Sequence, residues 1–125
     1  MMKDTHKEID PFVQERIPAT NGFLYQSLRF RLPRYPIPEL RLPGGRGKRL
    51  LDIGCNWGRW SIAAARKGYT VSGIDPVPQA ILAARRVAEQ LALDIDYRSG
   101  SGEIIPYPND TFDVARAEGR NQRPQ

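Results

Sequence analysis

The residues best suited to chemistry form one short stretch, Asp52 to Gly58, followed at a distance by one carboxylate. Asp52 ends a short apolar run, glycines stand at positions 54 and 58, and residues 61–65 have good helix-forming composition. A strand, a tight glycine loop and a helix in this order bring backbone N–H groups to a ligand at the helix N-terminus. The stretch therefore predicts a ligand-binding turn.

Asp75 supplies the second half of the pattern, 21 residues after Gly54 and at the end of the next apolar run. In doubly wound sheets a carboxylate at this place accepts hydrogen bonds from the ribose hydroxyls of a nucleoside. Aspartate at this position also often caps the helix that follows. The glycine loop at the matching distance favours the ribose interpretation, because the two features form one signature.

A dinucleotide site fits this loop poorly. Its pattern, Gly-x-Gly-x-x-Gly, needs a small residue and a third glycine where this chain has Asn56 and Arg59. Arg59 is large, and Trp57 crowds the same turn.

Residues 52–58, Asp-Ile-Gly-Cys-Asn-Trp-Gly, instead resemble the first motif of the class I S-adenosylmethionine-dependent methyltransferases, Asp/Glu-x-Gly-x-Gly-x-Gly. Asn56 replaces the middle glycine, and asparagine is among the few residues that tolerate a positive φ. Residues 73–75, Gly-Ile-Asp, are similar to the second motif of the family. Residues 103–113 are similar to its run from the adenine loop into the fourth strand.

The resemblance implies S-adenosyl-L-methionine as the cofactor. It places the glycine loop against the methionyl end, with Asp52 holding the amino group, and it places Asp75 on the ribose. Ser101 stands where many relatives have an aspartate that faces the adenine, and its hydroxyl would bond to the adenine amino group. The cofactor-binding residues expected from the resemblance are Asp52, Gly54, Cys55, Asn56, Gly58, Asp75, Ser101 and Gly102. No catalytic residue and no metal ligand is predicted.

Cys55 is the only cysteine, so neither an internal disulfide nor a thiolate metal cluster can form. We interpret it as a small buried residue in the cofactor pocket, because no partner base for a nucleophile is recognisable. Trp57 and Trp60 are interpreted as packing residues.

The elements that position these residues alternate along the chain. Strands are expected at 49–53, 70–74 and 94–98, helices at 57–67 and 79–91, and the start of a fourth strand at 112–115. This order predicts an α/β fold with a doubly wound, Rossmann-like parallel sheet, incomplete at about three to four strands with flanking helices. One side of the first strand would then be uncovered.

Three regions are expected. Residues 1–47 form an N-terminal arm and a Pro/Gly/Arg-rich linker along the surface, with the core beginning after it, and residues 21–32 fit either a helix or a strand. Residues 48–115 form a partial S-adenosylmethionine-binding domain. Residues 116–125 read as a disordered tail, because they lack the apolar run of a central parallel strand.

Composition narrows the function little. The chain has 125 residues, 40% hydrophobic and 26% charged, with a net charge of +5, which is ordinary for one soluble domain. The stretch from Arg29 to Arg49 contains seven basic residues and a single acidic residue, Glu39. They indicate a solvated arm or, on weaker grounds, a surface for nucleic acid or an anionic membrane. With no signal-peptide core and no run of ~18 apolar residues, we expect no membrane span and a cytoplasmic location.

Two hypotheses follow for the function. The first is the cofactor-binding half of a methyltransferase that acts on an unidentified acceptor. The alternative is a truncated, catalytically inactive remnant that acts, if at all, by binding a partner through its exposed sheet edge or basic arm.

Overall fold

The computed structural model describes residues 10–13, 35, 37–117 and 120–124. Its elements, in chain order, are β1 (Arg49–Ile53), α2 (Arg59–Arg66), β2 (Thr70–Asp75), α3 (Pro78–Gln90), β3 (Asp96–Ser99), β4 (Val114–Ala117) and β5 (Arg120–Pro124). The expected strands and helices between residues 49 and 99 are therefore present, with bounds that move by two residues or fewer.

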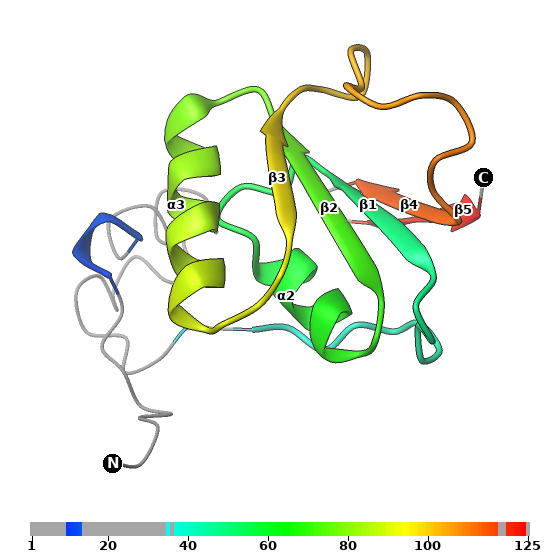
Figure 1. Cartoon of the computed structure of the whole chain (residues 1–125), viewed down its shortest axis with the longest axis horizontal. Helices are drawn as coiled ribbons and strands as arrows, with labels where there is room; N and C mark the ends of the chain where they lie inside the picture. The colour runs from blue at the N-terminus through cyan, green and yellow to red at the C-terminus, as the bar shows by residue number, and fades with distance from the viewer. Residues whose placement is uncertain (1–9, 14–34, 36, 118–119, 125) are drawn as a thin grey trace.

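The strands form one sheet in the order β3-β2-β1-β4-β5 (Figure 1). β1 lies in the middle and pairs in parallel with β2 and with β4, and β2 pairs in parallel with β3. β5 runs antiparallel to β4. The four parallel strands with their flanking helices confirm the incomplete Rossmann-like fold.

α2 and α3 pack on the same face of this sheet. α2 begins after Gly58, and α3 begins with Pro78, where the missing N–H costs no intrahelical bond. The buried residues of α3 recur at helical spacing and form the stripe that faces the sheet: Ala80, Ile81, Ala83, Ala84, Val87 and Ala88. Their packing fixes the loops at the carboxyl ends of the strands.

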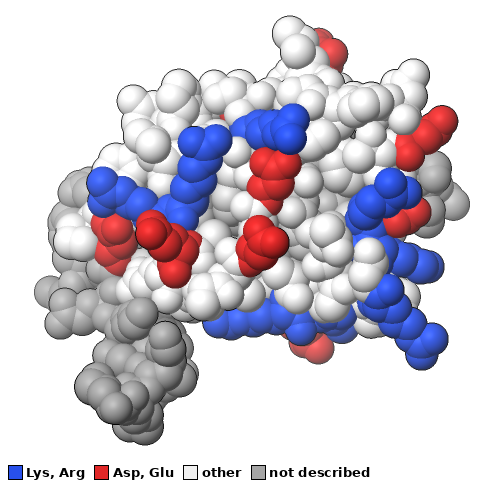
Figure 2. Space-filling model, viewed as in Figure 1, with Lys and Arg blue, Asp and Glu red and all other residues white. Residues whose placement is uncertain are grey.

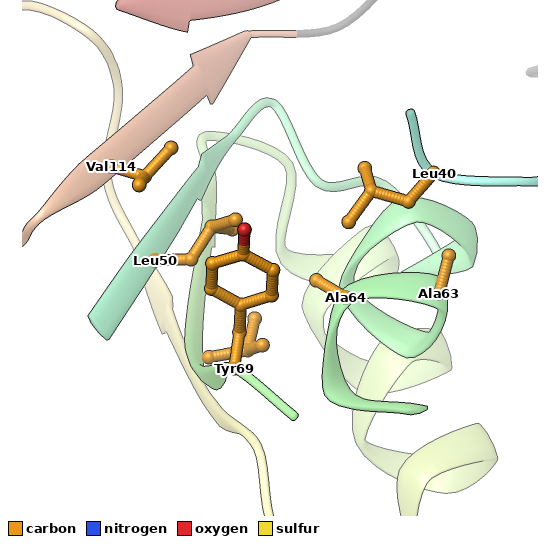
Figure 3. Packing of buried hydrophobic residues seen from close by; sticks show 7 residues of the cluster. Leu40, Leu50, Ala63, Ala64, Tyr69 and Val114 are labelled. Atoms are coloured by element: carbon orange, nitrogen blue, oxygen red, sulfur yellow. The ribbon is translucent and has the colours of Figure 1, made fainter. Parts of the chain in front are cut away.

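The core under α2 includes the segment that precedes β1. Leu40 packs with Ala63 and Ala64 of α2 and with Leu50 and Tyr69, as Figure 3 shows. Leu40 is 3% exposed. The expectation that the core begins only after residue 47 is therefore wrong, because an apolar residue within the Pro-rich segment covers α2.

The opposite face of the sheet is covered by the loop between β3 and β4. Leu51, Ile74 and Ala115 form a cluster there with Phe112. The rings of Tyr107 and Phe112 meet edge to face, with centroids 5.0 Å apart. Within the described part of the chain, this loop and not a helix supplies the apolar cover of the second face.

The end of the described chain differs from the expected disordered tail. β4 continues through Arg116 and Ala117, and β5 follows at Arg120–Pro124. The polar composition that suggested disorder includes Arg116, which is accommodated inside the fold by an ion pair with Asp52. β4 also covers the side of β1 that was expected to be open.

The basic stretch lies only partly within the described residues, since Arg29, Arg31 and Arg34 fall outside them. Arg49 forms an ion pair with Asp113 at 3.5 Å. Over much of the face in Figure 2, Lys and Arg side chains lie close to Asp and Glu side chains. The ambiguous segment 21–32 also lies outside the described residues.

Candidate functional site

The loop after β1 is a tight turn held against the end of β2. Gly54, Asn56 and Gly58 have φ values of 72°, 55° and 97°, all in the left-handed region that favours glycine and tolerates asparagine. The N–H groups of Gly54 and Cys55 both donate to Ile74 O, at 2.8 and 2.9 Å. Asn56 thus adopts the backbone conformation that its place in the motif requires.

Asp75 joins this loop to the start of α3. Its Oδ2 accepts a hydrogen bond from Asn56 N at 3.0 Å, and its Oδ1 accepts one from Val77 N at 2.9 Å. The carboxylate therefore bridges the glycine loop and the turn that leads into α3, although the N-cap of α3 is Val77 and not Asp75. The ribose contact stays a prediction. A carboxylate offers about four acceptor positions, so two remain for a ligand.

Asp52 has a different environment. It is 1% exposed, and its Oδ2 accepts a hydrogen bond from Ser61 Oγ at 2.7 Å. Its Oδ1 accepts one from Arg116 Nη1 at 3.1 Å. The guanidinium carbon of Arg116 lies 4.4 Å from the centre of the Trp60 ring. The carboxylate is thus already neutralised by a cation of the chain itself.

Ser61 and Arg116 were missed by sequence reasoning. Ser61 looked like one more helix residue, and Arg116 stood in the expected tail. Strand alternation places residues 114 and 116 on the same face, but the sequence does not show that this strand lies beside β1.

Cys55 is 4% exposed and packs with Ile81, Ala84 and Tyr97. Burial raises the pKa of its thiol, and the nearby charges of Asp52 and Asp75 raise it further. The thiol is therefore neutral at physiological pH, as expected for a packing residue. Trp57 is fully buried, with its ring centroid 5.8 Å from that of Tyr35.

The loop after β3 reaches the same edge of the sheet. Gly100 N donates to Asp75 O at 3.2 Å. Ser101 Oγ accepts hydrogen bonds from the N–H groups of Glu103 and Ile104, at 3.2 and 3.1 Å. Gly102 is open: an added Cβ would have Ile53 Cγ2, at 3.8 Å, as its nearest neighbour. Gly102 also lines a groove of about 520 Å³ that takes in none of the other expected site residues.

The loops after β1, β2 and β3 therefore meet at the carboxyl edge of the sheet, where ligands bind in open α/β folds. Asn56 Oδ1, a buried acceptor in the first loop, has no hydrogen-bond partner within the described residues. An acceptor left unpaired in this way fits a polar ligand. Trp57 Nε1 is also unpaired within those residues, but its ring is fully buried in the core cluster with Val13 and Tyr35. Of the two carboxylates, Asp75 bonds to the backbone of the glycine loop, whereas Asp52 is paired with Arg116.

Two absences concern the described residues alone. They contain no group of three or more His, Cys, Asp and Glu side chains that could hold a metal ion. None of their helices is long and apolar enough to cross a membrane.

A family model described as a methyltransferase domain matches residues 50–121. The chain belongs to this methyltransferase domain family. The match runs from the second residue of β1 to beyond β4 and includes all the expected site residues.

Individual relatives agree with the family. The ubiquinone biosynthesis O-methyltransferase of Methylobacterium nodulans is 38% identical over 87 residues, which are 70% of this chain and 32% of that protein. The protein of the same name from Cereibacter sphaeroides is 47% identical over 68 residues, 54% of this chain and 28% of that one. An S-adenosylmethionine-dependent methyltransferase structure from Mesorhizobium loti superimposes with a TM-score of 0.54 and 28% identity, covering 61% of this chain and 35% of that one. The chain spans about a third of the length of the curated relatives it matches.

Proposed function

We propose that the carboxyl edge of this sheet binds S-adenosyl-L-methionine, and that the protein transfers a methyl group to an oxygen atom of a small-molecule acceptor. The observation that carries the proposal is the joint geometry of Asp75 and the left-handed glycine loop. The names of the relatives, which specify O-methylation, support the acceptor atom.

In this proposal each loop holds one part of the cofactor. Asp75 uses its two remaining acceptor positions for the ribose hydroxyls. Gly54, Cys55, Asn56 and Gly58 allow the methionyl chain to approach the backbone closely.

Ser101 and Gly102 lie beside the adenine in the same proposal. Since Ser101 Oγ already accepts two backbone N–H groups, its hydroxyl is better suited to donate a hydrogen bond to a ring nitrogen of the adenine than to accept one from the amino group. Gly102 leaves open space for the base.

The bound cofactor would supply a methyl group on a sulfonium centre, an electrophile that needs no metal or acid to activate it. The contribution of the chain is then to hold the cofactor in one orientation, in line with the acceptor oxygen. The partner-pairing alternative loses one of its two grounds, because the open side of β1 is covered by β4. Its other ground, the basic arm, lies partly outside the described residues.

Isothermal titration calorimetry with S-adenosylmethionine and S-adenosylhomocysteine tests the proposal. Asp75→Asn keeps one oxygen, which can accept only one of the two backbone N–H groups, and it loses the charge that binds the hydroxyls. We therefore expect about 10- to 100-fold weaker binding, as for hydrogen bonds to a charged group. Asp94→Asn is the matched control, because Asp94 is exposed and lies in the connection between α3 and β3. Absence of binding to the folded wild type, or equal binding by both variants, would contradict the proposal.

A further inference from the structure

The buried pair of Asp52 and Arg116 is the one feature of the site that the proposed function does not explain. The two residues face each other in neighbouring parallel strands, Asp52 of β1 opposite Arg116 of β4. Both belong to the sheet face that α2 covers, since side chains alternate along a strand and Leu50 and Val114 pack there. The pair therefore lies under the helix that begins at the glycine loop.

Arg116 is fixed on more than one side. It is 2% exposed, donates to Asp52 Oδ1 at 3.1 Å, and has Trp60 against its guanidinium at 4.4 Å. Ser61 Oγ binds the other oxygen of the same carboxylate. A cation of this chain thus occupies the carboxylate that the family resemblance assigns to the amino group of the cofactor.

We propose that Arg116 competes with the methionyl amino group for Asp52, so that this chain binds its ligand mainly through the nucleoside end. The proposal rests on the proposed function, because it takes the ligand to be a nucleoside that carries an amino acid. A buried carboxylate needs one cationic partner and gains little from a second in the same space. An incoming ammonium must therefore displace the guanidinium or remain unpaired.

The expected consequence concerns how much the amino group of the ligand contributes to affinity. This contribution should be smaller than in a site whose carboxylate has no cation of the chain beside it. In the wild type, the amino group of the ligand should contribute little to affinity. In Arg116→Gln, Asp52 loses the guanidinium that bonds to its Oδ1, and the ammonium of the ligand takes that place. The amino group should then increase affinity by about 10-fold or more.

Calorimetry with two ligands on the full chain tests this difference. The ligands are S-adenosylhomocysteine and its analogue in which hydrogen replaces the amino group. For the wild type we expect dissociation constants within about 3-fold of each other, and for Arg116→Gln a preference of about 10-fold or more for the amino compound. Arg66→Gln, at the exposed end of α2, removes the same charge elsewhere and should behave as the wild type.

The outcomes separate this inference from the proposed function. If neither ligand binds the folded wild type or either variant, the proposed function fails and the inference with it. If both ligands bind but the preference is the same in wild type and Arg116→Gln, only the inference fails. Should Arg116→Gln not fold, the wild type decides alone: a loss of 10-fold or more on removing the amino group overturns the inference, and near-equal binding supports it.

Discussion

Cys55 combines burial with two neighbouring carboxylates, and all three act on its thiol in the same direction. Burial disfavours the thiolate, and the charges of Asp52 and Asp75 repel it, so the pKa lies above its ordinary value of 9.0. In the unfolded chain the thiol ionises near that ordinary value. The folded state therefore binds more protons than the unfolded state at alkaline pH.

This imbalance predicts a pH dependence of stability. Above about pH 9 the free energy of unfolding should fall with rising pH, by up to about 1.4 kcal/mol per pH unit for this one group. Below that pH the thiol is protonated in both states and has no such effect. Urea unfolding of the wild type and Cys55→Ala from pH 7 to pH 10 measures it, and the difference between the two should change only above about pH 9. A constant difference over the whole range would show that the thiol ionises equally in both states.

Single residues also show what the sequence could and could not predict about the site. The placement of Asp75 and Asn56 beside each other could be predicted, because it depends on local spacing and on the φ that a residue type tolerates. The pairing of Asp52 with Arg116 could not, because it depends on which strand lies beside β1. In the sequence, an arginine among polar residues looks solvated, and only the register places it in the interior.

In the loop between β1 and α2, Asn56 and Gly58 differ in whether a side chain can be accommodated. Gly58 has a φ of 97°, and an added Cβ would collide with the Tyr97 hydroxyl and lie 3.1 Å from Tyr97 Cζ. Asn56 has a φ of 55°, which glycine adopts without strain. Position 58 thus excludes a side chain, whereas the side chain at position 56 can be removed without backbone strain.

We expect Gly58→Ala to lower the free energy of unfolding by about 1–3 kcal/mol, from backbone strain and the displaced tyrosine. Asn56→Gly, which restores the middle glycine of the motif, should change it by less than about 1 kcal/mol. Urea unfolding at pH 7 compares the two. Equal effects would mean that the loop relaxes around either residue.

Elements whose apolar residues recur with a clear helical period were predicted better than strands that are defined by pairing with another strand. The apolar stripe of α3 alone marks a helix, so Pro78–Gln90 was placed within one residue at either end. β4 and β5 lack such a signal. β5 contains no long apolar run and is defined by its antiparallel pairing with β4, which composition does not reveal.

At the scale of the whole molecule, the segment before β1 is part of the core although its sequence resembles a linker. Lys67 Nζ donates to Leu40 O at 2.6 Å, and Tyr69 OH donates to Pro43 O at 2.8 Å. Gly45 N donates to Lys67 O at 2.8 Å. These bonds fasten the segment to the turn between α2 and β2. Prolines and glycines suggested a surface connection, but they do not show where a single leucine between them packs.

This attachment predicts that the segment stabilises the fold that carries the site. Leu40 is 3% exposed and packs against α2 (Figure 3), whereas Leu82, on α3, is 52% exposed. Leu40→Ala leaves a cavity and should lower the free energy of unfolding by about 2–4 kcal/mol. Leu82→Ala removes the same atoms from the surface and should change it by less than about 0.5 kcal/mol.

Urea unfolding followed by circular dichroism measures both variants under one set of conditions. A two-state domain of this size has about 5–15 kcal/mol of stability in all, so the loss at Leu40 should also shift the midpoint clearly. Ligand affinity measured well below that midpoint should stay the same in both variants, because neither leucine belongs to the site. If Leu40→Ala were as stable as Leu82→Ala, the segment would be a passive linker and residues 48–115 would hold the fold by themselves.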